Sequence, residues 1–484
     1  MLIALLVCML ALVAFVVIRR GKEKNHPPGP GGLPFIGQVF SINWKHQDFA
    51  FMKWYKQYGP IYKVRAGPET IVVLSDPELI REAFNKPATQ GRQSNAAFTL
   101  LYADKGIIFT SGELWHQTRR FTLFHLRNFG MGKSRLEAVI HEQIDGFMNV
   151  VLAPSEGRAL SLNRALDISV ANIIWGIVAG ESLGIEDERI LEVMDNVRKL
   201  NEVGFRILLL GTIPALLNLP DRLTGLNEVL KCFHYPINNL LQPAINLHKK
   251  SVDLGGEPRD YIDCFLQEQS KHPTLYTERH LLRSLIDLFF AGFDTTSTTL
   301  RWAFCFLCAR PDVQERLAAE LHQVVGRERA PTLADRPHLP FTEAVLMETQ
   351  RLANIAPIGV PHVSTAEFQL GGYTVPRGAQ VISLLTAVHH NEAYFPEPAR
   401  FLPERFLDAE GKVKPNKALM PFSVGKRSCM GEAMARAELF LFVTTVVQKF
   451  RLRFPDGFTH DFSINEERAF VNEPLPYSLI PERR

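Results

Sequence analysis

The most specific chemical pattern in the sequence surrounds Cys429, in the segment Phe422-Ser-Val-Gly-Lys-Arg-Ser-Cys-Met-Gly431. A lone cysteine is usually a small buried apolar residue, but here glycines stand on both sides of it. Gly425 and the final glycine let the backbone approach a flat partner closely. The start of a predicted helix just after the cysteine and the basic Arg427 both favour a thiolate. The segment therefore suits an axial iron ligand beside a cofactor that carries carboxylates.

A second unusual pattern, Ala291-Gly-Phe-Asp-Thr-Thr296, lies in the middle of a long apolar helix predicted for Glu278 to Ala309. Glycine and β-branched threonines weaken a helix, and Asp294 would be costly to bury without a partner. A solvated helix surface is the simplest alternative, but the neighbouring phenylalanines disfavour it. We expect a local helix distortion that forms a polar notch facing a cavity.

Two further pairs place chemically useful side chains about one helical turn apart. Glu348 and Arg351 are three residues apart, and Trp115 and Arg119 are four apart, so each pair lies on one helix face. An exposed ion pair of this kind contributes only roughly 0.3–0.5 kcal/mol. The order of these pairs along the chain, ahead of the cysteine segment, is therefore more informative than their spacing.

Phe422-x-x-Gly425-x-Arg427-x-Cys429-x-Gly431 resembles the haem-binding signature of the cytochrome P450 family at every fixed position. The resemblance covers nearly the whole chain and implies a haem-thiolate monooxygenase. It implies haem b as the cofactor, with Cys429 as the metal ligand and with Phe422, Gly425 and Arg427 in the cofactor site.

The resemblance also assigns roles to the other patterns. It implies that Asp294 and Thr295 deliver protons during oxygen activation. It gives a structural role to three residues, Glu348, Arg351 and Arg405, the last within Phe401-Leu-Pro-Glu-Arg-Phe406. It places five further side chains near the haem propionates: Trp115, Arg119, His362, Arg427 and Arg92. A lone histidine is more often an ordinary polar residue, so His362 depends most on the resemblance.

The elements that position these residues predict a mainly α fold with a small β portion, the cytochrome P450 fold, preceded by one N-terminal transmembrane helix. Hydrophobic periodicity predicts helices over the ranges 135–152, 159–178, 278–309, 312–325 and 432–449, and less clearly over 226–249, where Pro236 and Pro243 should kink or break it. Residues 59–75 predict a hairpin, and 368–385 predict further short strands. No linker-like segment interrupts residues 35–484, so we expect one catalytic domain there.

The N-terminal residues predict a membrane anchor. Leu2 to Ile18 carries no charge and spans about 26 Å as a helix, close to the thickness of an endoplasmic reticulum bilayer. A secretory signal peptide would have basic residues before this run and a cleavage site after it, whereas here the basic residues follow. We expect a signal anchor over 1–20, a basic Pro/Gly-rich hinge over 21–34, a short lumenal N-terminus and a cytosolic catalytic domain.

Composition narrows the class of protein further. A net charge of +3 over 484 residues gives no reason to expect nucleic-acid binding. Six scattered cysteines are too few for a disulfide framework and indicate a reducing compartment. Cys305 and Cys308 form a CxxC pair inside an apolar helix, where core packing is expected in preference to a redox or zinc site.

Two further segments, Leu126-Arg-Asn-Phe-Gly-Met-Gly-Lys133 and Pro258-Arg-Asp-Tyr-Ile-Asp-Cys-Phe-Leu266, resemble the microsomal family-two branch of animals. This resemblance implies residence in the endoplasmic reticulum membrane. No flavin- or nicotinamide-binding segment follows Cys429, so electrons are expected from an NADPH-dependent cytochrome P450 reductase, with cytochrome b5 as an optional second partner. The expected docking face for the reductase contains Arg119, Arg120, Arg127, Lys133, Lys426 and Arg436.

A hydrophobic small-molecule substrate is expected, because the five segments predicted to line its pocket are largely apolar: 96–109, 204–217, 288–293, 355–360 and 470–471. The apolar run 207–219 is expected to dip into membrane lipid. Two alternatives stay open: a haem-thiolate isomerase or dehydratase that needs no reductase, and a haem protein that senses or binds without turnover.

Overall fold

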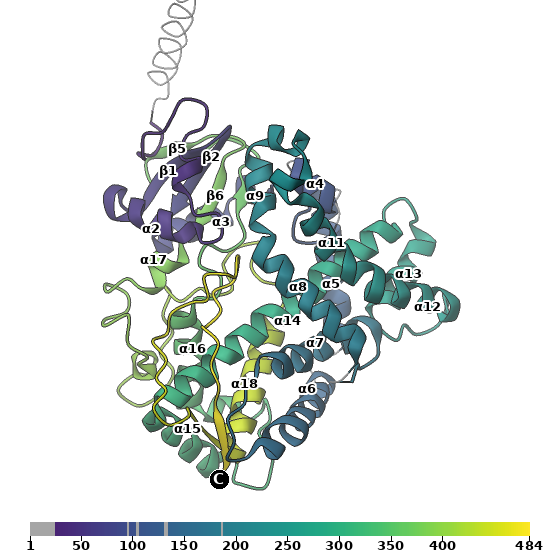
Figure 1. Cartoon of the computed structure of the whole chain (residues 1–484), viewed down its shortest axis with the longest axis vertical. Coiled ribbons are helices and arrows are strands. Elements are labelled where there is room, and N and C mark those ends of the chain that lie inside the picture. Colours follow the sequence, from purple (N-terminus) through teal and green to yellow (C-terminus); the bar gives the residue numbers. More distant parts are fainter. Residues whose placement is uncertain (1–24, 94–95, 103–105, 130–133, 185–186) are drawn as a thin grey trace, which may run out of the picture.

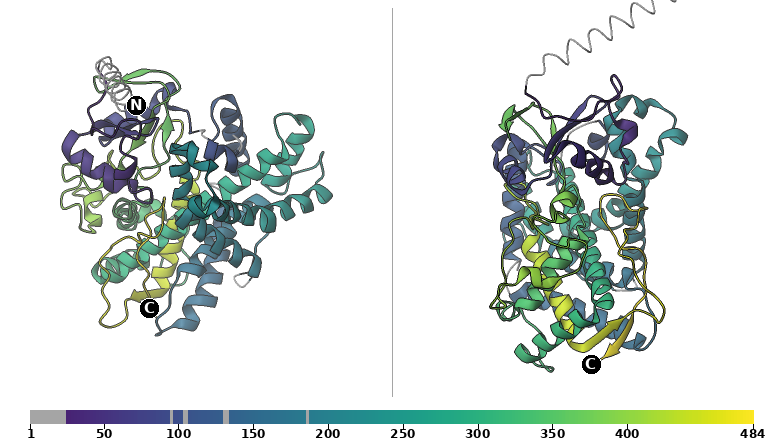
Figure 2. Two further views of the ribbon diagram at one scale, coloured as in Figure 1. Left: turned by 45° about the horizontal axis from the view of Figure 1, so that its top comes forward. Right: turned by 90° about the vertical axis from the view of Figure 1, so that its left-hand side faces the viewer.

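The computed structural model describes residues 25–93, 96–102, 106–129, 134–184 and 187–484. A large helical body carries a small sheet at one end, and the C-terminal strands lie at the opposite end (Figure 1). The other views show the same separation of the sheet from the helical body (Figure 2). The predicted class, mainly α with a small β portion, is therefore confirmed.

Helix α14 (Glu278–Ala309) runs through the centre of the helical body. Its N-cap Thr277 accepts a hydrogen bond from the backbone N–H of His280, as expected at a helix start. It packs against α7 (Asn163–Ala179), α16 (Pro340–Ala353) and α18 (Glu432–Lys449). Most of α14 and α18 is buried on all sides. Helix α18 is largely apolar around its circumference, whereas α14 also buries charged side chains such as Asp294 and Arg301, which are paired inside the protein. Helix α14 carries Asp294 and Thr295, and α18 begins directly after the segment of Cys429.

The main sheet joins distant parts of the chain. Its order is β1 (Ile61–Ala66), β2 (Glu69–Leu74), β6 (Gln380–Ser383) and β3 (His362–Val363). Strands β1 and β2 form the predicted hairpin, with Ala66 opposite Glu69, and β2 pairs in parallel with β6. Two small antiparallel pairs complete the strands: β4 (Phe368–Leu370) with β5 (Tyr373–Val375), and β7 (Phe450–Arg453) with β8 (Ile480–Arg483).

The remaining elements surround the central helices and the sheet. The other α-helices are α2 (Gln47–Tyr58), α3 (Pro77–Asn85), α4 (Ala96–Tyr102), α5 (Gly112–Asn128), α6 (Ser134–Phe147), α8 (Glu188–Val203), α9 (Phe205–Thr212), α10 (Asp221–Thr224), α11 (Leu226–Pro236), α12 (Gln242–Ser251), α13 (Tyr261–Lys271), α15 (Pro311–Val324) and α17 (Leu385–His389). Short 3-10 turns occupy Val39–Ser41, Pro87–Thr89, Ala153–Ser155, Pro214–Asn218, Arg336–His338 and Pro403–Phe406.

Two of the predicted helices, 226–249 and 135–152, contain π-helical turns. Residues 226–249 form α11 and α12 joined by the π turn Ile237–Leu241, so the segment changes its hydrogen-bond pattern between the two prolines instead of breaking. The helix predicted for 135–152 is α6 followed by the π turn Met148–Leu152. The helix predicted from residue 159 begins four residues later, at Asn163, and residues 159–162 are not helical.

The predicted anchor over 1–20 lies outside the described residues. Across the described part of the chain, no helix is both long and apolar enough to cross a bilayer. The described part of the hinge, residues 25–34, is neither helix nor named strand, as proline and glycine predict. It lies along β1, where the N–H of Lys63 donates to the carbonyl of Pro28 at 2.7 Å.

Candidate active site

The cysteine loop is closed by backbone hydrogen bonds. The N–H of Cys429 donates to the carbonyl of Phe422 at 2.9 Å, and the N–H of Ser428 donates to Gly425 at 3.2 Å. Helix α18 begins immediately afterwards, at Glu432. The Cys429 side chain is accessible, yet enough protein surrounds it that desolvation affects its pKa. An accessible group surrounded by protein faces an interior space.

The balance of effects on the Cys429 thiol differs from the sequence prediction. Burial raises its pKa, and this outweighs the N–H groups of Gly431 and Glu432 and the charge of Arg119, which lower it. The predicted effect of the helix start is present, but the lowering charge is that of Arg119 and not that of the predicted Arg427, and burial is the larger effect. A bound cation inverts this balance, because a coordinating thiol is deprotonated outright.

Gly425 is required by the protein's own packing, which corrects the reason given from the sequence. Its φ of +80° lies in the region that favours glycine. A Cβ at this position would clash with the backbone carbonyl of Phe84 at the end of α3. Gly431 has an ordinary negative φ of −86°, and an added Cβ would meet only the Cys429 sulfur, at 3.9 Å.

Four basic side chains from four segments of the chain gather at the loop. They are Arg92, Arg119, His362 and Arg427. Burial and then Arg119 lower the pKa of Arg92 to about 9, and burial followed by Arg92 and Arg119 lowers the pKa of Arg427 to about 8. Burial and the charges of Arg92 and Arg427 also hold the pKa of His362 well below its usual range. Shifts of this sign show cations that repel one another in a poorly solvated place.

The partners recorded for these guanidinium groups are backbone carbonyls and an aromatic ring. Arg427 donates to the carbonyls of Gln90 and Thr110 at 2.9 and 2.6 Å, and its guanidinium lies 3.6 Å from the centroid of the Trp115 ring. Arg119 donates to the carbonyl of Ser428 at 2.7 Å.

Arg92 has a buried guanidinium nitrogen that is available for a further hydrogen bond. It donates to the carbonyl of Pro361 at 3.2 Å, while its buried Nε finds no partner among the described residues. Buried cations without a carboxylate partner are costly. The cluster therefore fits an anionic group with carboxylates of its own, such as the propionates of haem.

His362 is held by a backbone bond and a ring. Its Nδ1 lies 2.7 Å from the carbonyl of Thr89, and since a carbonyl only accepts, Nδ1 must donate. The imidazole also stacks on Phe84, with ring centroids 3.8 Å apart. These contacts fix the ring edge that carries Nε2 relative to the arginines.

Asp294 is buried and fully partnered. One oxygen accepts from Arg468 at 2.8 Å and the other from the side-chain amide of Asn201 at 2.9 Å. The predicted helix distortion is wrong, because α14 is unbroken through this segment. The Thr295 hydroxyl bonds to the carbonyl of Ala291 at 2.8 Å, a bond that an intact helix accommodates. Ala291 itself is exposed among buried neighbours, so this turn of the helix faces an interior space.

The three predicted structural residues form one buried ion network. Glu348 receives two bonds from Arg351, at 2.7 and 2.8 Å, and one from Arg405 at 3.1 Å. The side chains of Glu348 and Arg351 have no exposed surface. The pair is therefore unlike an exposed i,i+3 pair, and its partner Arg405 comes from the turn Pro403–Phe406.

His389, which the sequence did not single out, connects this network to the cysteine segment. Arg351 donates to its carbonyl at 2.8 Å, and the N–H of Met420 lies 3.2 Å from its Nε2. Burial lowers the pKa of His389 to about 3, so the ring is neutral and Nε2 accepts. Its sequence context, in a short helix after β6, gave no signal of this role.

Glu438 is a second buried group missed from the sequence. It lies on α18 with both carboxyl oxygens buried, and the side chain of Thr296 is close enough to favour its charged form. Burial raises its pKa to about 8, against a smaller opposite effect of Thr296. The folded protein therefore holds this carboxyl protonated at neutral pH, while the unfolded chain ionises near pH 4.5.

Glu438→Gln should flatten the dependence of stability on pH. Between the unfolded value and about 8, the folded state holds a proton that the unfolded state has lost, so stability falls as pH rises, by up to about 1.4 kcal/mol per pH unit. Glutamine removes this proton linkage. Melting temperatures measured from pH 5 to 8 should fall less steeply in the variant. Parallel curves for both proteins would contradict the assignment.

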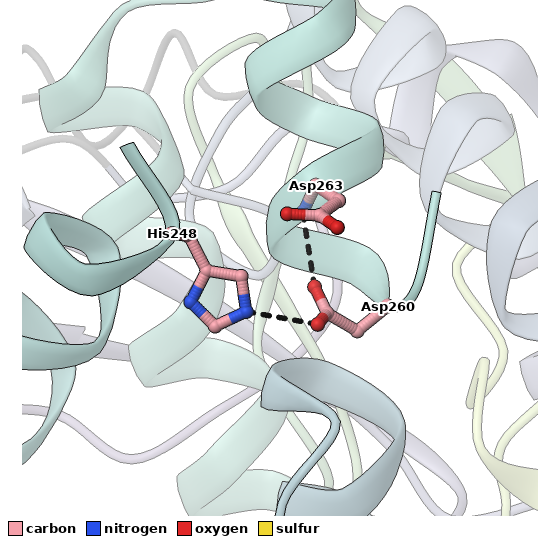
Figure 3. Close-up of side chains that lie close together, drawn as sticks. All are labelled: His248, Asp260 and Asp263. Carbon is pink, nitrogen blue, oxygen red and sulfur yellow. Dashed lines mark hydrogen bonds and ion pairs between the residues drawn. The ribbon is translucent and has the colours of Figure 1, made fainter. Parts of the chain in front are cut away.

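A separate cluster of ligand-type side chains has a structural explanation. His248 on α12 and Asp260 and Asp263 at the start of α13 lie together (Figure 3). Asp260 caps α13 by accepting from the N–H of Asp263 at 3.0 Å, and it bonds to His248 at 2.8 Å. Arg259 occupies both oxygens of Asp263, at 2.6 and 2.9 Å. The cluster ties α12 to α13.

Comparison with known proteins identifies the class to which this fold and site belong. A family profile described as Cytochrome P450 matches residues 27–481, and the chain belongs to this family. It is a haem-thiolate monooxygenase whose haem is bound through the thiolate of Cys429. When bound, the haem supplies the oxygen-activating iron.

The chain is similar to several animal members of the family over almost its whole length. It is 36% identical to cytochrome P450 2F3 of Capra hircus, covering 99% of each chain. It is 34% identical to farnesoate epoxidase of Bombyx mori, covering 98% of this chain and 94% of that protein. It is 35% identical to cytochrome P450 2J2 of Homo sapiens, covering 97% and 95%.

The two cysteines of the CxxC pair are packed in the core. Cys305 and Cys308 are buried in α14 with free thiols. Burial raises the pKa of both thiols well above the usual range, which makes them poor nucleophiles and poor metal ligands. The predicted core packing of the CxxC pair is confirmed.

Proposed function

We propose that this protein is a membrane-bound monooxygenase that inserts one oxygen atom from O2 into a hydrophobic small molecule, with electrons from NADPH supplied by a separate reductase. The observation that carries the proposal is the accessible Cys429 beside a cluster of cations that has no carboxylate partner in the described part of the chain. That arrangement fits a thiolate-bound haem, and family membership supports the oxygen chemistry.

Each residue of the site then has a task of its own. Arg92, Arg119 and His362 bind the propionates, and Arg427, stacked on Trp115, completes the charged pocket. Phe422 and Gly425 shape the loop that presents Cys429. Asp294 and Thr295 would hold and move protons during oxygen activation, and the buried network of Glu348, Arg351 and Arg405 would keep the surrounding structure rigid when haem is bound.

A shared substrate pocket is supported by contacts between the five segments predicted to line it, or between residues directly next to them. Asp287 on α14 accepts from the N–H groups of Ile107 and Ile108, at 2.6 and 2.8 Å. The ring of Phe470 lies against Gly204, α4 packs on α9, and the N–H of Asn472 donates to Ile355. Residues 103–105 lie outside the described residues.

The proposal of a hydrophobic substrate is supported by apolar side chains that these segments leave exposed. Leu100, Val360 and Phe470 are each about half exposed, as expected for walls of a pocket that a ligand covers. Among the relatives, one is named as a farnesoate epoxidase. We therefore favour hydroxylation or epoxidation of a lipid, steroid, terpenoid or xenobiotic.

The membrane assignment rests on the N-terminal sequence. We propose a single anchor over 1–20, a short lumenal N-terminus, and a catalytic domain on the cytosolic face of the endoplasmic reticulum, with 207–219 in contact with lipid. Reductase, and optionally cytochrome b5, would dock on exposed basic residues: Arg120, Arg127 and Lys426.

The other three residues predicted for that docking face are not available as exposed, unpaired cations of the described chain. Arg119 is turned toward Ser428 in the site, so it is a poor surface contact. Arg436 is engaged by Glu432 at 3.0 Å. Lys133 lies outside the described residues.

Reconstitution with reductase tests the proposed function. We expect NADPH and O2 consumption that rises with a hydrophobic substrate, together with an oxygenated product and a spin shift on binding. Turnover of a peroxide substrate without NADPH would indicate an isomerase or dehydratase instead. Haem binding without turnover across steroids, fatty acids, terpenoids and drugs would indicate a sensor.

A further inference from the structure

The carboxylate of Asp294 is clamped by two donors that belong to different parts of the fold. Arg468 comes from the segment that precedes β8, and Asn201 comes from α8. Together they occupy both carboxylate oxygens. Asp294 is only 7% exposed, so its orientation depends on these two partners.

Arg468 is held in place by other charges. It pairs with Glu473 at 3.2 Å, and Glu473 pairs with Arg301, which is fully buried on α14. Arg301 in turn bonds to Asp167 of α7 at 3.0 Å. Because each of these groups is buried and multiply bonded, Arg468 is the fixed side of the clamp.

Asn201 is the second residue that holds Asp294, and it does so with a neutral side-chain amide on helix α8. Its bond to Asp294 has no charge on the donor, so it is the weaker of the two. Its backbone carbonyl accepts from the N–H of Ala469 at 2.9 Å. Asn201 therefore ties α8 both to Asp294 and to the segment of Arg468.

Asn201 and Arg468, the two residues that hold Asp294, lie next to segments predicted to line the substrate pocket. Phe470, two residues after Arg468, is 48% exposed and has a φ of +70°, an unusual conformation for a bulky residue. Its ring lies against Gly204, one turn after Asn201. A ligand that displaces Phe470 or α8 would therefore move the residues that hold Asp294.

We propose that Asn201 is a positioning residue for Asp294 and that, with Arg468, it couples the placement of α8 to proton delivery by Asp294 and Thr295. This inference rests on the proposed monooxygenase function. In the described part of the chain Asn201 bonds to Asp294 and Ala469 and to none of the four cations beside Cys429, so it acts through Asp294.

Asn201→Asp is the informative substitution, because it keeps the size of the side chain and replaces the amide donor with a carboxylate. The charged groups around Asp294 are Arg468 and Glu473 from the C-terminal segment, Arg301 from α14, Asp167 from α7 and Arg198 from α8. Two carboxylates that share one site cannot both ionise easily. The added acid should therefore shift proton transfer to higher pH.

The test compares full-length, haem-loaded protein with Asn201→Asp and with Asn196→Asp as a control. Asn196 lies on the same helix and bonds only to the carbonyl of Glu192 at an exposed position. For Asn201→Asp we expect the acid limb of the pH profile of product formed per NADPH to move upward by roughly one pH unit or more. The control should match the wild type.

A second readout does not depend on turnover. Infrared titration should show the protonated-carboxyl band of Asn201→Asp appearing at higher pH than in wild type, assigned by its loss in Asp294→Asn. An unmoved band and an unmoved pH profile, in a variant with normal haem spectrum and melting temperature, would overturn the inference. Absence of NADPH-dependent oxygenation by the wild type would instead contradict the proposed function and leave the infrared result to decide the inference.

Discussion

Glu348→Gln is expected to lower the free energy of unfolding by about 3–5 kcal/mol, the usual cost of removing one partner from a buried ion pair. The substitution keeps the shape of the side chain but removes the negative charge between Arg351 and Arg405. The N–H of Leu402 also loses its carboxylate acceptor. Denaturant unfolding of the haem-loaded protein, followed by circular dichroism, measures the loss.

Glu343→Gln is the matched control on the same helix. Glu343 pairs with Arg336 at 2.7 Å but is partly exposed, so its removal should cost no more than about 1 kcal/mol. Because loss of Glu348 reaches the cysteine segment through His389 and Met420, its variant should also lose haem more readily. Equal, small effects of the two substitutions would show that burial does not strengthen the Glu348 network.

Arg92→Met is expected to accelerate haem loss by roughly 10- to 100-fold, while the haem-free protein changes in stability by less than about 1 kcal/mol. A charge-assisted hydrogen bond to a propionate accounts for about 1.5–3 kcal/mol in the loaded protein. Among the described residues the Arg92 guanidinium donates to the carbonyl of Pro361, and burial followed by the charge of Arg119 lowers its pKa to about 9. Transfer of haem to excess apomyoglobin measures the rate.

Arg120→Met provides the control for that experiment, since it removes one positive charge from an exposed position on α5. Its haem-loss rate should equal that of the wild type, whereas its turnover with reductase is expected to fall if Arg120 belongs to the docking face. Similar haem-loss rates for both variants would contradict the role of Arg92 in propionate binding.

The parts of the fold with strong local patterns were predictable. The bounds of α14 and α18 agree with those predicted because an apolar run with clear end signals specifies a helix locally. The hairpin of β1 and β2 followed from two β-branched runs around a Gly-Pro turn. The cysteine loop was predictable because its residues are contiguous and specific.

The contacts between distant segments were not predictable from one sequence. Asp294 and Arg468 are 174 residues apart, and Asn201 and Asp294 are 93 apart, so no local pattern predicts that these partners meet. The helix distortion expected at Asp294 was wrong for the same reason, because the partners that satisfy this acid lie outside its helix. Likewise, Gly425 is required by the carbonyl of Phe84, which local spacing does not reveal.

Carbon monoxide binding to the reduced haem protein tests the central claim most directly. The wild type should show the red-shifted Soret band of thiolate-ligated haem, and Cys429→Ala should lack that band, because the thiolate donates electron density to the iron. Cys264→Ala, which removes a buried free thiol elsewhere in the fold, should retain it. A red-shifted band that persists in Cys429→Ala would contradict the assignment of Cys429 as the iron ligand.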